Sequence, residues 1–179
     1  MNQLCATPAT PPPAVLHAAD PHSVGTAFRD ALGRFCSGVV IVTAIDDGVP
    51  VGMTVGSFTS ISLDPPLVGF FAGRTSSTLP QLTRAGRLCV NVLAESQGEL
   101  ARQFARSGTD RFAGVGWTAG TNGAPRLSGA HAWIDGSLTL DQPIGDHDLV
   151  VCRVEGLTVP EHNEPLVFHR SEFRGLRAS

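Results

Sequence analysis

The stretch VVIVTAIDDGVPVGMTVGSFTSISLDPPLVGFF, residues 39–71, decides the fold class of this 179-residue chain. Its first residues, 39–45, form an unbroken apolar and β-branched run, and Asp46-Asp47-Gly48 then supplies the residues of a tight hairpin turn. Residues 51–63 predict the returning strand, which the double proline ends because proline donates no ladder hydrogen bond. A new strand is expected at 67–71. This opening therefore predicts antiparallel β-structure.

The rest of the chain predicts further short strands and a few short helices. Strands are expected at 87–93, 132–140, 147–157, 166–168 and around Phe173, helices at 24–38, at 76–85 and after a capping box that begins at Ser96, and a long loop at 107–129. We expect the apolar face of the helix at 24–38 to pack on the sheet. Many short strands with three peripheral helices predict a mainly β protein, an antiparallel barrel with helical trim.

The first residues of the chain differ in composition from the remainder. Pro8 and the prolines at 11–13 lie among small residues, and such a composition sustains neither helix nor strand. Hydrophobic residues make up 42% of the chain, which is enough for one sizeable core. We therefore predict a disordered, proline-rich tail at 1–22 and a single domain at 23–179.

Charge and cysteine usage narrow the functional classes. The net charge is −3, the isoelectric point is near 6.0, and the chain has no lysine and no basic cluster, so we expect no nucleic acid partner and no membrane partner. The four cysteines lack the paired spacing of a metal or dithiol site, so we expect no metal and interpret Cys36, Cys89 and Cys152 as small buried hydrophobes. The start of the chain lacks signal-peptide features and no apolar run spans a bilayer. A cytoplasmic location is expected.

Hydroxyl side chains crowd one predicted strand, at 54–60, where apolar β-branched residues are the norm. Hydroxyls and exposed backbone amides at this place can hydrogen-bond the rim of a planar polar heterocycle. The same residues are equally compatible with an ordinary solvent-facing strand surface. The residues alone leave both interpretations open.

A second polar feature is the turn Gly145-Asp146-His147-Asp148, which places a histidine between two carboxylates at the start of a strand. The carboxylates can orient the imidazole ring or favour its charged form. A surface histidine at a turn with no special role is the alternative, and it is the more frequent case.

At these residues the sequence resembles the short-chain flavin reductases, which have an FMN-binding split-barrel fold and serve as reductase components of two-component flavin monooxygenases. The resemblance runs from about residue 28 to 174, and the segments that carry it occur in the family's order: 28–43, 52–68, 76–78, 89–93, 145–147 and 165–170. It implies an antiparallel split β-barrel with a few short peripheral helices. Two residues depart from those common in the family: Gly56, where a side-chain contact to the flavin is missing, and Phe173, where many relatives place a tyrosine hydroxyl near the site.

The resemblance also implies a set of binding residues. Flavin contacts fall on Thr54, Ser57, Phe58, Thr59, Ser60, Asn91 and Phe112, and flavin phosphate contacts on Arg74, Ser76, Ser77 and Thr78. A hydroxyl cluster where a helix starts is chemically suited to an anion. His147 matches the family histidine beside the nicotinamide, which positions the carboxamide or supplies a proton. No metal ligand is implied.

The function implied is that of an NAD(P)H:flavin oxidoreductase. It would reduce diffusible FMN or FAD with NADH or NADPH and supply reduced flavin to a partner monooxygenase or halogenase, acting as a homodimer. The alternatives are a split-barrel protein that keeps FMN tightly bound and acts as an oxidase, and a non-catalytic flavin or electron carrier. Neither the choice of flavin nor the choice of nicotinamide follows from the sequence.

Overall fold

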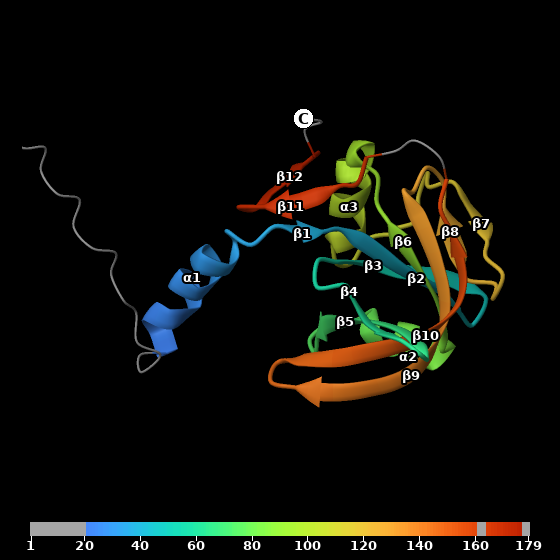
Figure 1. The fold of residues 1–179 in the computed structure, drawn as a ribbon, viewed down its shortest axis with the longest axis horizontal. Helices are drawn as coiled ribbons and strands as arrows, with labels where there is room; N and C mark the ends of the chain where they lie inside the picture. Colours follow the sequence, from blue (N-terminus) through green and yellow to red (C-terminus); the bar gives the residue numbers. More distant parts are fainter. Residues whose placement is uncertain (1–20, 161–163, 177–179) are drawn as a thin grey trace, which may run out of the picture.

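The computed structural model describes residues 21–160 and 164–176. Residues 1–20 of the predicted tail lie outside these described residues. The centre of the molecule is a seven-stranded antiparallel sheet with the strand order β3-β2-β6-β9-β10-β5-β4, which curls into a barrel (Figure 1). A three-stranded sheet, β1-β11-β12, and a small hairpin, β7-β8, complete the β-structure. The prediction of a mainly β, antiparallel split barrel with a few short helices is confirmed.

The elements follow one another in chain order. They are α1 (Pro21–Leu32), β1 (Ser37–Gly38), β2 (Val40–Asp46), β3 (Val49–Val55), β4 (Thr59–Leu63), β5 (Pro66–Gly73), α2 (Leu79–Ala85), β6 (Arg87–Val92), the 3-10 turn η1 (Glu95–Gln97), α3 (Gly98–Ala105), β7 (Trp117–Ala119), β8 (Pro125–Leu127), β9 (Ala132–Ile144), β10 (His147–Thr158), β11 (Val167–His169) and β12 (Glu172–Arg174).

The barrel is split because its two edge strands do not pair with each other. Strand β3 pairs with β2, and β4 pairs with β5, so each edge strand has one side without a neighbouring strand in the described sheet. Residues 56–58 join the two edges. The strand predicted at 51–63 is therefore two strands with a break at Gly56, where the chain crosses from one edge of the sheet to the other.

Two apolar clusters hold the fold together. The larger fills the barrel with side chains such as Val42, Phe70 and Val150, and α2 adds Leu79 and Leu82 to it. The smaller lies under α3 and is centred on Phe104, Leu93 and Leu127. Burial of these apolar side chains, each worth about 1.5–3 kcal/mol, is the main force that holds the polar edge of the barrel in position.

Other boundaries also differ from the predictions. The segment 107–129 is not a plain loop, because it contains the hairpin β7-β8. The predicted capping box at Ser96 is wrong: the amide oxygen of Gln97 instead accepts a hydrogen bond from the backbone N–H of Ala94. Cys36 is exposed rather than buried, whereas Cys89 and Cys152 are buried as predicted.

Helix α1 contradicts the expectation that its apolar face packs on the sheet. It begins at Pro21 and ends at Leu32, because Gly33 and the turn that follows it lead directly into β1. It points away from the barrel (Figure 1). Phe28 and Leu32 of the helix and Phe35 just after it are 59%, 56% and 76% exposed. Their apolar surface is therefore available for contacts outside the barrel.

Candidate functional site

The hydroxyl-rich stretch lies at the split edge of the barrel. Ser57, Thr59 and Ser60 are exposed and Phe58 is half-buried. The outer side of β4 has no strand partner among the described residues, so its backbone N–H and C=O groups remain available to hydrogen-bond a ligand. An edge of this kind, fringed with hydroxyls, suits the polar rim of a flat heterocycle.

Two of the predicted hydroxyls, those of Ser57 and Thr54, hydrogen-bond the protein backbone. The hydroxyl of Ser57 donates to the carbonyl of Phe71 at 2.9 Å and accepts from the Phe71 N–H at 2.9 Å, which ties residues 56–58 to β5. The hydroxyl of Thr54 donates to the carbonyl of Ala101 in α3 at 2.7 Å. Both side chains therefore have structural partners, and a ligand at this edge would find mainly backbone groups and the side chains of Thr59 and Ser60.

A cleft of about 270 Å³ opens between β3, the start of α2 and the loop after α3. Ser77, Thr78 and Phe112 line it, together with Arg111. One guanidinium nitrogen, Arg111 Nη1, donates to the Thr78 hydroxyl at 2.6 Å and to the Gly52 carbonyl at 2.7 Å. Burial lowers the pKa of Arg111, yet a guanidinium remains protonated in proteins, so the cleft holds a fixed positive charge. Nε of Arg111 donates to the Arg106 carbonyl at 2.6 Å, so Nη2 is the guanidinium nitrogen left to donate to a phosphate group in the cleft.

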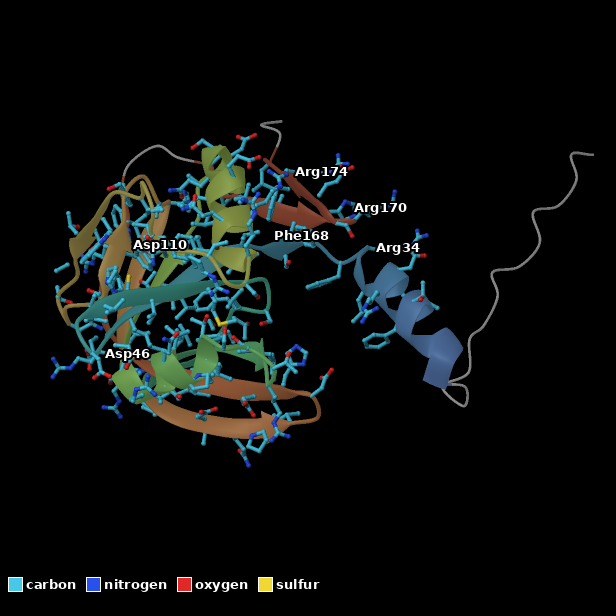
Figure 2. All side chains as sticks on the ribbon, turned by 180° about the vertical axis from the view of Figure 1, so that it is seen from behind. Arg34, Asp46, Asp110, Phe168, Arg170 and Arg174 are labelled. Carbon is cyan, nitrogen blue, oxygen red and sulfur yellow. The ribbon has the colours of Figure 1, made fainter. Side chains whose placement is uncertain are left out.

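Arg111 was missed in the sequence analysis. It lies in the segment interpreted as a loop, directly before the predicted Phe112, and Asp110, labelled in Figure 2, accepts a hydrogen bond from the Phe112 N–H at 3.0 Å. The available signal was an arginine in a glycine-rich segment beside a predicted contact. Arg111 is 33 residues from Thr78 in the sequence, so local pattern could not predict their hydrogen bond.

Ser76 stabilises the turn that leads into α2. Its hydroxyl oxygen accepts hydrogen bonds from the N–H groups of Thr78 and Leu79, both at 3.2 Å. Thr78 is buried, at 6% exposure, and its hydroxyl accepts the bond from Arg111. Of the three predicted hydroxyls, Ser77 has the greatest freedom to contact a ligand in the cleft.

His147 is the first residue of β10 and lies opposite Gly73 of β5. Its Nδ1 is 2.7 Å from Asp146 Oδ1, and this hydrogen bond lowers the pKa of the Asp146 carboxyl. With Nδ1 held by the carboxylate, Nε2 points toward Gly73, where an added Cβ would lie 4.0 Å away. The ring is half-exposed and oriented, as a group that contacts a second ligand must be.

Arg74, predicted to contact the flavin phosphate, lies next to His147 in the structure. Its Nε is 3.7 Å from Asp148 Oδ1, and its backbone N–H donates to the Asp146 carbonyl at 3.1 Å. It does not line the cleft at Arg111. Ser57 ties this end of the sheet to the hydroxyl edge, because its partner Phe71 is two residues, roughly 7 Å, from Gly73.

The structure does not bring Asn91 to this site. Its side chain is 0% exposed and donates to carbonyls of β2 and β6 and to the Thr43 hydroxyl, while its oxygen accepts from the Leu127 N–H at 2.7 Å. These bonds attach β8 to the barrel. Phe112, by contrast, lines the cleft and packs edge-on against Phe104 at 5.0 Å between ring centroids.

The arrangement fits a flavin nucleotide on chemical grounds. The Arg111 cleft supplies a guanidinium and hydroxyls for a phosphate, and the split edge supplies backbone and hydroxyl groups for a ring rim. Within residues 21–160 and 164–176 no cluster of three or more metal-ligating side chains occurs. No helix in this part of the chain is long and apolar enough to cross a membrane.

Comparison with known proteins agrees with this geometry. Residues 32–177 match the model of the flavin reductase like domain. The chain is 44% identical over 149 residues, which is 83% of its length and 76% of the relative's, to the reductase subunit HsaB of a flavin-dependent monooxygenase from Rhodococcus jostii. The chain therefore belongs to the flavin reductase family, and it is an oxidoreductase.

Two solved structures show the same fold. Nitrilotriacetate monooxygenase component B from Mycobacterium thermoresistibile superposes with a TM-score of 0.85 at 38% identity, over 88% of this chain and 89% of that one. NADH:FAD oxidoreductase SgcE6 from Streptomyces globisporus gives a TM-score of 0.83 at 33% identity, over 94% of this chain and the whole of the other.

Proposed function

We propose that this chain uses NADH or NADPH to reduce diffusible FMN or FAD and that the reduced flavin passes to a separate monooxygenase or halogenase. The observation that carries the proposal is that β3, whose residues 49–52 line the Arg111 cleft, leads directly into the exposed split edge at 56–60. A cofactor held on an open surface can leave after reduction. The resemblance to monooxygenase reductase components and to an NADH:FAD oxidoreductase supports both the donor and the partner.

In this proposal the chain acts by positioning. Bound flavin would accept a hydride from a nicotinamide ring stacked on its open face, a transfer for which alignment at about 3–3.5 Å supplies much of the acceleration. Thr59, Ser60 and the backbone of 56–58 orient the ring edge, and Arg111, Ser77 and Thr78 hold the phosphate. Supporting contacts from Ser57, Thr54 and Ser76 keep these groups in place.

His147 would orient the nicotinamide. Asp146 holds Nδ1 at 2.7 Å, so the other ring nitrogen, Nε2, is the one presented to a ligand. Nε2 can then hydrogen-bond the carboxamide or supply a proton to the reduced flavin. Arg74, braced by Asp148, lies beside it and supplies a nearby positive charge.

We further propose that the functional unit is a homodimer located in the cytoplasm. The outward face of β5, β9 and β10 beside His147 carries the exposed side chains Phe71, Leu140 and Ile144, which strand register places on one side of the sheet. Several exposed large apolar side chains on one face of a sheet are typical of a subunit interface. The buried cysteines Cys89 and Cys152, which form no disulfide, are compatible with a reducing compartment.

The deciding experiment measures nicotinamide oxidation with and without added free flavin, for both flavins and both nicotinamides. We expect turnover that requires added flavin and protein that loses its yellow colour on desalting. Absence of turnover in all four combinations would contradict the proposal, and colour retained through desalting would instead favour a tightly bound FMN.

The role of His147 has a separate test. His147→Ala should raise the KM for the nicotinamide or lower turnover, while the flavin Kd changes little, because the imidazole lies on the nicotinamide side. Asp47→Ala, in the hairpin at the far end of β2 and β3, serves as the control. An equal loss of flavin affinity in His147→Ala would contradict the assigned role.

A further inference from the structure

The side chain of Gln103, in the last turn of α3, contacts the loop that carries Arg111. Its amide nitrogen, Nε2, donates to the Arg111 carbonyl at 2.9 Å and to the Ala113 carbonyl at 3.0 Å. A primary amide nitrogen has two N–H donors, so Gln103 uses both of them on this loop. Because a carbonyl accepts but cannot donate, the nitrogen of the amide, and not its oxygen, has to face the loop. Gln103 therefore fixes the backbone on both sides of Phe112.

The loop also has hydrogen bonds of its own, and these shape it without attaching it to the barrel. Asp110, labelled in Figure 2, accepts from the Phe112 N–H at 3.0 Å, and its carbonyl accepts from the Ala113 N–H at 3.4 Å. The Val115 N–H donates to the Phe112 carbonyl at 3.0 Å. Each of these bonds joins two residues of the loop. The two bonds from Gln103 instead join the loop backbone to α3, so they set where the loop lies.

The guanidinium of Arg111 leaves this loop in a fixed direction. Nε donates to the Arg106 carbonyl at 2.6 Å, at the C-terminal end of α3, where the helix dipole favours a cation. Nη1 donates to the Gly52 carbonyl at 2.7 Å and to the Thr78 hydroxyl at 2.6 Å. Within the described part of the chain, Nη2 is the guanidinium nitrogen without an acceptor, so it is the one that can reach a ligand. Since hydrogen bonds to oxygen weaken beyond about 3.2 Å, a small displacement of the Arg111 backbone would misplace Nη2.

Helix α3 is itself attached to β3, the strand that lines the cleft. The Thr54 hydroxyl donates to the Ala101 carbonyl at 2.7 Å. The buried ring of Phe104 lies so close to β3 that a Cβ added to Gly52 would be 2.9 Å from it. A close-packed contact of this kind leaves little room for α3 to shift. The helix thus joins the strand of the cleft to the loop, and through Gln103 the position of the helix determines that of Arg111.

We infer that Gln103 is a positioning residue for the flavin phosphate, and that it acts by holding Arg111 so that Nη2 points into the cleft. This inference rests on the proposed function for the identity of the bound anion. Gln103 does not line the cleft, so it would contact no ligand itself. Its two hydrogen bonds would set how strongly the protein prefers the phosphorylated flavins, FMN and FAD, over riboflavin. Binding of the flavin ring at 56–60 would not depend on it.

The first test compares FMN with riboflavin, which lacks the phosphate, on the full-length protein. Gln103→Met keeps the length of the side chain and removes both donors, so the FMN Kd should rise about 5- to 10-fold, the equivalent of about one net hydrogen bond. The riboflavin Kd should stay the same. Flavin fluorescence quenching measures both constants. An unchanged FMN Kd, or an equal rise for riboflavin, overturns the inference, since a merely structural role would affect both flavins alike.

Gln97→Met is the matched control. The Gln97 amide also makes two hydrogen bonds, with the Ala94 N–H and the Ser128 carbonyl, both at 2.9 Å, and it lies outside the cleft. Both flavin Kd values should stay unchanged in this variant, and a rise in the FMN Kd equal to that of Gln103→Met overturns the inference. Unfolding midpoints show whether each variant is folded. If Gln103→Met does not fold, Gln103→Glu, which keeps the side-chain shape but has no donor at neutral pH, replaces it with the same expected result.

The second test asks whether Gln103 acts through Arg111. In a double-mutant cycle on the FMN Kd, adding Gln103→Met to Arg111→Gln should change nothing further, because the group that it positions is already gone. Additive effects of the two substitutions overturn the inference. If Arg111→Gln alone leaves the FMN Kd unchanged, the phosphate assignment and the inference fail together. If the cycle shows the expected coupling but the protein oxidises no nicotinamide with either flavin, the proposed function fails while the inference stands.

Discussion

Two polar regions of this barrel contain similar residue types, but one is buried and the other is exposed at an edge of the sheet. Around β6, β8 and β9, Asn91, Asp135 and Arg126 are buried or nearly so, and described residues provide their hydrogen-bond partners. At the split edge, Thr59 and Ser60 are exposed, and the side of β4 that faces away from β5 has no strand partner within the part of the chain that the structure describes. In the first region the polar groups hydrogen-bond one another and stabilise the fold, whereas in the second they remain exposed and can bind a ligand.

The difference shows that burial and partnership, rather than residue type, distinguish a structural polar group from a binding group. The Asp135 carboxylate accepts from Arg126, from the Thr121 hydroxyl at 2.6 Å and from the Thr121 N–H at 2.9 Å. Burial by itself raises the pKa of Asp135, but these hydrogen bonds outweigh it and lower that pKa below its usual value. Nothing in the sequence separates Asp135 from a catalytic aspartate.

The largest effect is expected for Asp135→Ala. It leaves Arg126 without its buried partner and frees the Thr121 donors, so the free energy of unfolding should fall by about 3 kcal/mol. Urea unfolding measures this loss. Glu172→Ala, which breaks an exposed pair with Arg174, is the control and should change stability little. If the two substitutions lowered the free energy of unfolding equally, the distinction between the buried and the exposed polar region would be wrong.

Arg111→Gln tests whether the exposed polar region binds the flavin phosphate. Removing the guanidinium from the cleft should raise the FMN Kd about 10- to 100-fold, as loss of a charge-assisted bond to phosphate predicts. Riboflavin, which lacks the phosphate, separates binding from folding, because its Kd should stay the same. Arg106→Gln, in the same loop but outside the cleft, should leave both affinities unchanged. A parallel loss for riboflavin would mean that Arg111 only supports the fold.

Asn91→Ala should lower the stability of the fold and leave flavin affinity nearly unchanged, although the family resemblance implies that Asn91 contacts flavin. The substitution leaves the buried Leu127 N–H without its acceptor, so the free energy of unfolding should fall by about 2 kcal/mol, although the Thr43 hydroxyl keeps its bonds to the Cys89 and Pro125 carbonyls. The Kd for flavin, measured by fluorescence quenching on the folded protein, should change less than twofold. A tenfold rise in Kd would return Asn91 to the flavin site.

The smallest effect concerns pH. Because the pKa of Asp135 is lower in the folded than in the unfolded chain, its contribution is complete above the unfolded value of about 4 and is lost as pH falls through the folded pKa. The stability gap between wild type and Asp135→Asn should therefore be widest near neutral pH and shrink below about pH 4. Urea midpoints at three pH values measure it, and a gap that does not vary would rule out this linkage.

Several elements followed from local sequence alone. The apolar run at 39–45, the hairpin at Asp47 and Gly48, and the alternating pattern of 132–140 predicted β2, its turn and most of β9, because side-chain period and turn residues act between near neighbours. The candidate site was predicted in part. His147 and the hydroxyl edge lie where a ligand can reach them, but the helix at 24–38 proved shorter and did not pack on the sheet.

What the sequence determined by itself was the class of fold and the segments that carry the chemistry, since both depend on composition and short-range pattern. Tertiary structure alone decided which polar groups remain free. Arg111 joins Thr78 across 33 residues and Asn91 is consumed by β8, pairings that depend on how the barrel closes. Because a hydrogen bond needs its partner within about 3 Å, the role of a polar side chain is set by its neighbours in space.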